Sequence, residues 1–511
     1  TQGTFTIGGE AADVLGLSEA DVTAVVEHMG GGFGSKFGLD IPGDIACQMA
    51  RTAKRPVHLL LDRKGEFSCV GNRSAGRQRV VAGCDAEGRL TALSAEIETH
   101  GGLGRGSNPG LPYIYEVEEA ARTQSSVLMN TDASRAMRAP GHPQASFAME
   151  SVVDELAYKV GVDPVEARKR NLSDEVYHRQ LDRVSKEIGW ADHPHRLAPG
   201  EGDGWEATGI GFAVSTWGGG GRPVCQTEVR IASDGSVSVE VGTQDLGTGV
   251  RTYVAAIVAE EFALSIDAVT PRIGSTRYGA ANASGGSVTT ACLAPSVKDA
   301  AWNARRSFLA KIADSIGVDA DQLRCEDGSV VVAESTERRL TWREACALLP
   351  AEGLSERGKW KHQLAGNGVH GAQAAKVRVD LKTGQVQVLE MVGIQDCGLP
   401  LNHLALRSQM NGGMIQALGY ALLEERVVDD ELGLMLNANM EDYKIPGTME
   451  IPLMKAIVDE DDTRQEVIGM AEPAVVPGAS AIANAVYNAC GARVRDLPIT
   501  PDKVLAALGR V

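Results

Sequence analysis

The chain has 511 residues, which is long for one ordinary domain and predicts two to four. A hydrophobic content of 43% with only 5% aromatic residues and 59 glycines is typical of a globular protein with many tight turns, and it excludes disordered and fibrous proteins. The formal net charge of −17 argues against a nucleic acid or an anionic membrane as partner, because phosphate binding needs a basic surface. A small molecule or a protein is the expected partner.

The nine cysteines are scattered, without a C-x-x-C pair, and no histidines cluster at zinc spacing. This pattern excludes a local thiolate metal site or iron–sulfur cluster and favours free thiols in a reducing compartment. No apolar run reaches membrane-spanning length and no signal peptide is visible, so we expect a cytoplasmic protein. The chain begins with Thr1 and not with methionine, which favours a fragment, a processed chain or a truncated one.

Strand and helix patterns alternate over the first part of the chain. The β-rich residues 21–27 predict a buried strand, followed by a glycine loop at residues 30–36 and a helix over residues 43–53. Asp163 is placed to cap a later helix, with a proline at its first position and Glu166 completing a capping box. The other elements predicted here are strands over residues 57–62, 79–84 and 90–98 and a helix over residues 145–160.

Between residues 193 and 205 the pattern gives way to proline, glycine and aspartate, which is typical of a domain boundary. Two more glycine loops follow, at residues 242–249 and 283–290, and each leads into a helical pattern, the second reaching about residue 312. The remaining predictions are strands over residues 209–216, 224–231, 237–241, 330–333, 375–379 and 386–392 and helices over residues 410–422, 481–489 and 502–508.

The three glycine loops share one design, a flexible loop at the start of a helix. Glycine lets backbone N–H groups approach a phosphate closely, and a helix start favours an anion. The first loop matches neither a Walker nor a Rossmann phosphate loop, because Ser35 and Phe37 stand at required positions. On its own it is equally well explained as a structural turn. Together the three loops predict a large, phosphate-bearing ligand contacted from several directions.

Glu472 stands directly before Pro473, on a short turn near the C-terminus. A carboxylate held at such a turn can act as a general base if its surroundings exclude water and tune its pKa. The alternative is a solvated turn glutamate, which is the better interpretation of an isolated Glu-Pro pair. The other motifs must decide between the two.

In chain order, the motifs resemble those of the molybdenum-cofactor subunit of the xanthine oxidase family, the molybdenum hydroxylases. The resemblance covers nearly the whole chain, and although each motif is weak alone, the ordered set is specific. The motifs are GGGFGSK at residues 30–36, RAPGHPQ at 138–144 with Glu150 and Asp163-Pro164, GTQ at 242–244 with Gly247 and Gly249, the Ser/Gly/Thr loop at 284–290, DCG at 396–398 with Gln409, and Glu472-Pro473 followed by ANAV at 483–486.

The resemblance implies an α+β fold of two elongated cofactor-binding domains, residues 1–195 and 205–511, with mixed sheets and helices and the cofactor buried between them. It implies a molybdenum-pterin cofactor, in the form of molybdopterin cytosine dinucleotide, whose pterin dithiolene holds the metal without ligands from protein side chains. Glu472 would be the catalytic base. The residues that would contact the cofactor are Gln2, Gly32, Phe33, Gly34, Arg138, Leu246, Gly247, Thr248, Gly286, Ser287, Val288, Thr289 and Gln409.

The implied reaction is oxidation of an aldehyde, aromatic aldehydes included, to a carboxylate with oxygen derived from water. Phe37 stands where purine-oxidising members carry a glutamate, and it disfavours purines because a polar ring edge would lack its partner. Trp217 and Arg222 complete the expected substrate pocket, although a solvated side chain is an equal alternative for Arg222. Hydroxylation of an aromatic N-heterocycle is the alternative reaction.

The resemblance also implies partner subunits. The chain has no cluster or flavin motif, so a 2Fe–2S subunit and an FAD subunit are expected to take the electrons. Family members carry a region upstream of the position matching Gln2, which another chain would supply here or which has been lost. A non-catalytic cofactor-binding fragment is therefore a further alternative. A twin-arginine signal on a partner subunit would make the complex periplasmic.

Overall fold

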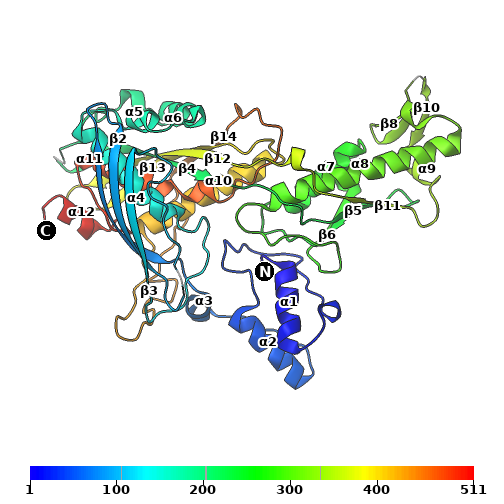
Figure 1. Cartoon of the computed structure of the whole chain (residues 1–511), viewed down its shortest axis with the longest axis horizontal. Helices are drawn as coiled ribbons and strands as arrows, with labels where there is room; N and C mark the ends of the chain where they lie inside the picture. Colours follow the sequence, from blue (N-terminus) through cyan, green and yellow to red (C-terminus); the bar gives the residue numbers. More distant parts are fainter. Residues whose placement is uncertain (105, 202–203, 334) are drawn as a thin grey trace.

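The computed structural model describes residues 1–104, 106–201, 204–333 and 335–511. Two lobes lie side by side along the long axis of the molecule, and the first two helices, α1 (Thr4–Leu15) and α2 (Asp40–Ala53), project below them (Figure 1). Both lobes combine helices with mixed sheets. This architecture confirms the predicted α+β class.

One lobe is built on a four-stranded sheet with the order β14-β13-β12-β4. Strand β12 is antiparallel to both of its neighbours, and β13 is parallel to β14. The strands and the C-terminal helices of this lobe are β4 (Glu206–Trp217), β12 (Val369–Asp380), β13 (Val386–Gln395), β14 (Leu453–Val458), α10 (His403–Leu422), α11 (Gly478–Cys490) and α12 (Pro501–Ala507).

Helix α11 packs closely on β4 because Gly211 of the strand faces the helix. A Cβ atom at Gly211 would lie 2.2 Å from the backbone nitrogen of Ala485, so the strand and helix could not approach as closely with any other residue. The next residue, Phe212, points to the opposite face of the sheet, as the two-residue period of a strand requires. That face is covered by α4 (His142–Lys159) and α6 (Glu175–Ile188), from the first part of the chain.

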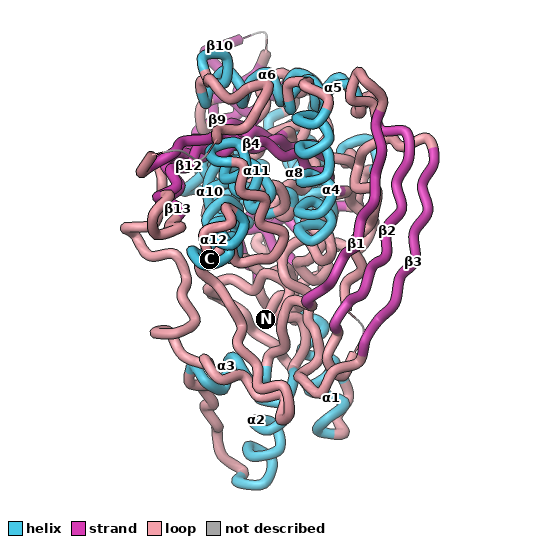
Figure 2. Tube along the Cα trace, turned by 90° about the vertical axis from the view of Figure 1, so that its left-hand side faces the viewer, coloured by secondary structure: helices cyan, strands magenta, loops and turns pink. Residues whose placement is uncertain are grey.

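A three-stranded sheet, β1-β2-β3, lies on the outside of this lobe with β3 at its open edge (Figure 2). Strand β2 is antiparallel to β1 and parallel to β3. Leu93, Ala95 and Ile97 of β2 point inward into the core shared with α4. The elements of this part are α3 (Arg63–Cys69), β1 (Ala75–Cys84), β2 (Leu90–His100), β3 (Glu119–Val127) and α5 (Pro164–Arg170).

The other lobe contains a four-stranded sheet, β11-β5-β6-β7, packed against the long helix α8 and against α7. Alternate residues of β6, Val237, Val239 and Val241, point into this core. None of the described helices is long and apolar enough to cross a membrane. The elements are β5 (Thr227–Ile231), β6 (Val237–Val241), α7 (Val250–Glu261), β7 (Val269–Ile273), α8 (Thr289–Ile316), β8 (Leu323–Glu326), β9 (Ser329–Val332), β10 (Ser335–Thr341), α9 (Trp342–Cys346) and β11 (Leu354–Gly358).

Most predicted helices and strands are present, with ends shifted by a few residues, but two predicted strands are wrong. Asp21 ends a short 3-10 helix, and residues 22–27 form a loop with one bridge from Val25 to Ser275, in which Val25 is 59% exposed. Residues 57–62 form a loop in which Leu60 is 84% exposed. Both segments have strand-like composition but no neighbouring strand to pair with along their length, and composition alone cannot supply one.

The predicted capping box of α5 is only half formed. Asp163 caps the helix, since its side chain accepts a hydrogen bond of 2.8 Å from the backbone N–H of Val165. Glu166 does not reach back to the cap and instead pairs with Lys169 at 3.3 Å. Asp163 also accepts a hydrogen bond of 3.0 Å from Trp190 Nε1, so the cap residue ties α5 to the segment after α6.

The predicted domain boundary, residues 193–205, includes residues 202–203, which lie outside the described residues. Helices α4 and α6 precede this boundary, whereas β4 and β12 follow it, and all four contribute to one core. The two halves of the sequence are therefore packed together. The division into domains 1–195 and 205–511 stays a prediction.

Candidate active site

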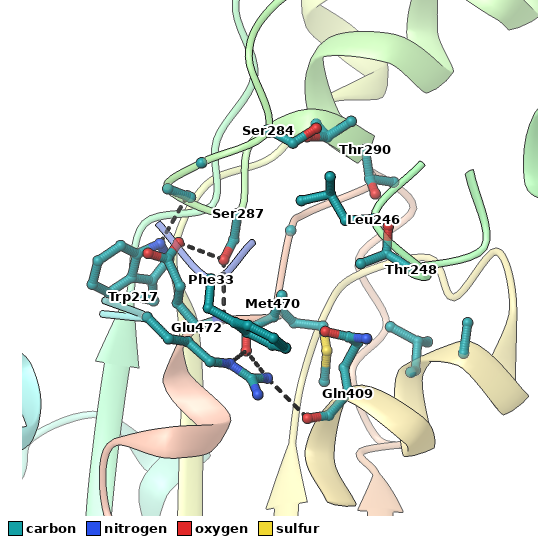
Figure 3. Close-up of a pocket in the computed structure, with 18 of the residues that line it drawn as sticks. Phe33, Trp217, Leu246, Thr248, Ser284, Ser287, Thr290, Gln409, Met470 and Glu472 are labelled. Carbon is teal, nitrogen blue, oxygen red and sulfur yellow. Dashed lines mark hydrogen bonds between the residues drawn. The ribbon is translucent and has the colours of Figure 1, made fainter. Parts of the chain in front are cut away.

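A cavity of about 380 Å³ is lined by residues from both lobes and from the N-terminal segment. Its volume lies in the range of small-molecule binding sites. All three glycine loops line it, and so does Glu472 (Figure 3). Segments that are hundreds of residues apart in the sequence therefore meet around one space.

Most of the predicted site residues line this cavity. They are Gln2, Gly32, Phe33, Gly34, Phe37, Arg138, Trp217, Leu246, Thr248, Gly286, Ser287, Thr289, Gln409 and Glu472. Gly247 and Val288 belong to the same loops but are not among the residues that line it. The fold does not bring Arg222 into the cavity either, and its side chain is exposed.

Glu472 directly precedes a short 3-10 helix, Pro473–Val475. Ser287 Oγ donates a hydrogen bond of 2.8 Å to Glu472 Oε2, and the backbone N–H of Ala139 donates one of 3.2 Å to Oε1. Burial raises the pKa of this carboxyl, and the two hydrogen bonds and the charge of Arg138 lower it in part. Glu472 thus faces the cavity with both oxygens held and with a higher proton affinity than an exposed glutamate.

Arg138 holds the turn that carries Glu472. Its Nε donates a hydrogen bond of 2.8 Å to the carbonyl of Ala471, and its Nη2 donates one of 2.9 Å to the carbonyl of Gln409. Its Nη1 donates to Gln416 Oε1 at 3.0 Å. Burial lowers the pKa of Arg138 to about 10, so the guanidinium stays charged near neutral pH. The cation both positions the turn and places positive charge at the cavity wall.

Gln2 joins the first and third glycine loops. Its Oε1 accepts hydrogen bonds from the N–H groups of Gly34 at 2.8 Å and Lys36 at 3.1 Å, and its Nε2 donates to the carbonyl of Ser284 at 2.7 Å. Gln244, in the second loop, extends the link by donating to Ser284 Oγ at 2.5 Å. Sequence reasoning gave Gln244 and Ser284 no individual role, although both stand inside recognised motifs. Their contacts exist only once the loops meet.

Three non-glycine residues around Glu472 have backbone φ angles in the left-handed region. The values are +51° for Phe33, +58° for Ala139 and +58° for Ser287. Such conformations cost about 1–3 kcal/mol each and persist only where the surroundings enforce them. Two of the three, Ala139 and Ser287, donate the hydrogen bonds to Glu472, and the carbonyl of Phe33 accepts one of 2.6 Å from the backbone N–H of Arg138. Of the eight described non-glycine residues with such angles, these three contact Glu472 or line the cavity.

The other side of the cavity has features that favour a phosphate-bearing ligand. Helix α8 begins there at Thr289, and no side chain caps its N-terminus, so its unpaired N–H groups favour an anion. The hydroxyl-bearing residues Thr248 and Thr290 line the cavity as well. Among the described residues, no group of three or more His, Cys, Asp or Glu could hold a metal ion. A metal at this site would need ligands supplied by its cofactor.

Two family models, each described as a molybdopterin cofactor-binding domain, match residues 1–172 and 183–452. The aldehyde oxidoreductase molybdenum-binding subunit PaoC of Escherichia coli strain K12 is 31% identical over 524 residues, covering 98% of this chain and 70% of that protein. The xanthine dehydrogenase molybdenum-binding subunit of Escherichia coli O157:H7 is 26% identical over 521 residues, covering 94% and 69%.

Two solved structures agree in fold. Quinoline 2-oxidoreductase from Pseudomonas putida 86 matches with a TM-score of 0.86 at 22% identity, over 100% of this chain and 71% of that one. Aldehyde oxidoreductase from Desulfovibrio gigas matches with a TM-score of 0.80 at 22% identity, over 100% and 57%. With the sequence matches, these findings show that the chain belongs to the molybdenum-binding large subunits of the molybdenum hydroxylases, a family of molybdenum-dependent oxidoreductases.

Proposed function

We propose that this chain oxidises an aldehyde to a carboxylic acid, with oxygen derived from water, as one subunit of a larger complex. The observation that carries the proposal is Glu472, held by Ser287 and Ala139 in a cavity to which all three glycine loops contribute. A half-buried carboxylate whose pKa is raised by desolvation is a suitable proton acceptor near neutral pH. The relative PaoC is named as a subunit of an aldehyde oxidoreductase.

The proposed cofactor is a molybdenum-pterin in its cytosine dinucleotide form. When bound, it supplies a Lewis acid that activates water and accepts electrons from the substrate. The uncapped start of α8 and the threonine side chains around it support binding of the phosphates. The residues that would hold the cofactor are those of the expected contact set that line the cavity, with Gly247 and Val288 from the same loops. The lining residues are Gln2, Gly32, Phe33, Gly34, Arg138, Leu246, Thr248, Gly286, Ser287, Thr289 and Gln409.

In this proposal the protein positions the substrate and moves a proton. Glu472 takes a proton at its carboxylate as oxygen adds to the aldehyde carbon, and Ser287 and Ala139 keep that carboxylate oriented. Phe37 places an apolar ring at the cavity, against Gly285, where a Cβ atom would lie 2.2 Å from the ring. A purine would find no hydrogen-bond partner on this ring, so its presence favours aldehydes.

We also propose that iron–sulfur and FAD subunits take the electrons. The relative in Paenarthrobacter nicotinovorans is named as one subunit of a dehydrogenase complex. A cytoplasmic location is proposed, because all nine cysteines are free in the structure.

The test is to purify the native complex with its partner subunits, to measure molybdenum, iron and flavin, and to assay aldehydes, nicotinate and purines. We expect stoichiometric molybdenum on this chain and iron and flavin on the partner subunits. We also expect faster turnover of aldehydes than of heterocycles. Faster turnover of heterocycles would contradict the proposed substrate. A complex without molybdenum and without turnover would favour the non-catalytic alternative.

A further inference from the structure

Two buried glutamines hold the turn that carries Glu472, and the proposed reaction gives neither of them a role. Gln395 Nε2 donates a hydrogen bond of 3.1 Å to the carbonyl of Met470. Gln373 Nε2 donates one of 2.7 Å to the carbonyl of Ala474. The chain is therefore held two residues before Glu472 and two residues after it.

Both glutamines lie on the four-stranded sheet. Gln373 belongs to β12, and Gln395 is the last residue of β13. In the antiparallel pairing of these strands, Gln373 stands opposite Gly393 and Gln395 stands opposite Gly371. Because residues that stand opposite each other, or two apart along a strand, share a face, both side chains leave the same face of the sheet. Each glutamine faces a glycine, which leaves room for the amide to extend toward the turn.

The two amides are almost completely removed from solvent. Gln373 is 4% exposed and Gln395 is 2% exposed. Ala375 and Met391, on the same face, belong to an apolar core that helices α10 and α11 also form. A polar group in such a core is unfavourable unless it forms hydrogen bonds. Gln373 Oε1 accepts no hydrogen bond from the described residues, so the donated bond to the turn is what favours an amide at this position.

The turn needs support of this kind. Residues 469–472 lie outside the helices and strands, so no ladder of backbone hydrogen bonds fixes them. Ser287 Oγ accepts a hydrogen bond of 2.9 Å from the backbone N–H of Glu472 and also donates to its carboxylate. The carboxylate is therefore tied to the backbone of the turn and moves with it. Displacement of a reacting group by about 1 Å can lower a rate by about 10²-fold.

We propose that Gln395 and Gln373 are positioning residues for Glu472. They tie its turn, on both sides, to the two central strands of the sheet, and so they set where the carboxylate stands in the cavity. Neither glutamine lines the cavity, so each acts through the turn and not through contact with the substrate or the cofactor. The inference rests on the proposed function, in which Glu472 is the base.

Gln395→Met in the native complex tests this proposal. Methionine has about the length of glutamine but cannot donate a hydrogen bond. We expect kcat for benzaldehyde to fall by about 10-fold or more and KM to change by less than about 2-fold, because the base is displaced while the substrate contacts remain. Gln387→Met, on the same strand but exposed, is the matched control and should change neither value. Molybdenum content should equal that of the wild type in both variants.

A conservative variant provides a second readout. In Gln395→Glu a protonated carboxyl can donate to the carbonyl of Met470, whereas a carboxylate cannot. Burial raises the pKa of a carboxyl at such a position, so its protonation falls within a range of about pH 5–8. We expect the kcat of Gln395→Glu, relative to that of the wild type at the same pH, to rise as the pH is lowered. The same ratio for Gln395→Met should not change with pH.

A third readout does not depend on turnover. Hydrogen–deuterium exchange reports how often the backbone of the turn opens. We expect faster exchange of the amides of residues 469–476 in Gln395→Met than in the wild type or in Gln387→Met. If Gln395→Met does not assemble, Gln373→Met replaces it in the kinetic and exchange measurements.

Three results would overturn the proposal: equal exchange in Gln395→Met and the wild type, an unchanged kcat, or a ratio for Gln395→Glu that does not depend on pH. If the wild-type complex oxidises no aldehyde and exchange is faster only in Gln395→Met, the proposed function fails, while the hold of the sheet on the turn stands.

Discussion

Glu472 shows how the fold decides between two interpretations of a single residue. A glutamate before a proline on a turn is ordinarily solvated, and nothing in its immediate sequence shows otherwise. In the structure it is half-buried beside Ser287 and Ala139, and the nearer of these in the chain is 185 residues away. The motif predicts the carboxylate as a candidate base, but only the tertiary structure supplies the partners that fix and tune it.

Replacing Glu472 with glutamine tests its role as base. The amide keeps the size and one acceptor oxygen but cannot take up the proton, so we expect kcat to fall by roughly 10²–10⁴-fold with molybdenum content unchanged. Steady-state turnover and metal analysis of the same preparation check this. Glu466→Gln, at a nearby glutamate that does not line the cavity, is the control and should retain turnover. Near-normal turnover by Glu472→Gln would remove this residue from the mechanism.

Ser287 should set the pH at which Glu472 becomes an active base. The hydrogen bond from Ser287 Oγ favours the charged carboxylate and so opposes the rise in pKa that burial causes. In Ser287→Ala this opposition is lost and the pKa of Glu472 rises further. Because the base works only when deprotonated, the acid limb of the kcat/KM profile should move to higher pH. An unchanged limb, or a shift to lower pH, would show that Glu472 does not control it.

At the scale of elements, the glycine loops work through close approach of backbones. Gly34 has a φ of +117°, and a Cβ atom there would lie 2.5 Å from the carbonyl oxygen of Ala136. Gly30 belongs to the same loop, but a Cβ atom there would meet nothing within 4 Å, and its φ is not in the left-handed region. The backbone angle and the close packing therefore require glycine at position 34, whereas neither requires it at position 30.

We expect Gly34→Ala to lower both the Tm and the molybdenum content of the complex. The added methyl group forces the loop away from the segment that carries Arg138, and the unfavourable φ adds about 1–3 kcal/mol of strain. Thermal unfolding and metal analysis of the purified complex measure both effects. Gly30→Ala, the matched variant, should leave both unchanged. Equal molybdenum contents in the two variants would contradict the role of Gly34.

Elements stabilised locally are predictable from the sequence, whereas those stabilised by a distant partner are not. The cap at Asp163 predicts the helix that follows it, and the turn at residues 233–235 predicts β6 as a hairpin strand. Strand β3 was not predicted, because all of its residues are exposed and its sequence has no apolar alternation. It exists through parallel pairing with β2. Residues 57–62 show the opposite case, a strand-like composition without a partner.

The same limit applies to the site. The ordered motifs predicted that three loops and Glu472 would share a cavity, and they do. Arg222 was expected in the substrate pocket, but its direction depends on the preceding glycine loop, where Gly219 has a φ of +74°. Glycine permits many conformations, so the sequence could not show that Arg222 would point to solvent.

At the scale of the whole molecule, a buried polar network joins the two halves of the chain. Arg168 of α5 is fully buried, and it donates hydrogen bonds of 2.8 Å both to Glu150 Oε2 on α4 and to the carbonyl of Phe212 on β4. Asn484 of α11 donates to the same carbonyl at 3.1 Å. Contacts from four elements thus converge in one core, and one of these elements, α11, begins at Gly478, shortly after Glu472 in the sequence.

Replacing Arg168 with methionine should strongly destabilise the protein. Burial raises the pKa of Glu150 and Arg168 is the main group that opposes this rise, so the variant leaves a buried carboxylate without its counter-charge. Breaking a buried ion pair costs about 3–5 kcal/mol, whereas Arg183→Met, which removes a surface pair with Glu187, should cost only about 0–1 kcal/mol.

Because protonation neutralises Glu150, the loss of Tm in Arg168→Met should shrink as the pH is lowered and grow as it is raised. Thermal unfolding of both variants between pH 5 and pH 8 measures this. Similar Tm values for the two variants would mean that the pair between Arg168 and Glu150 does not help to hold the two halves together.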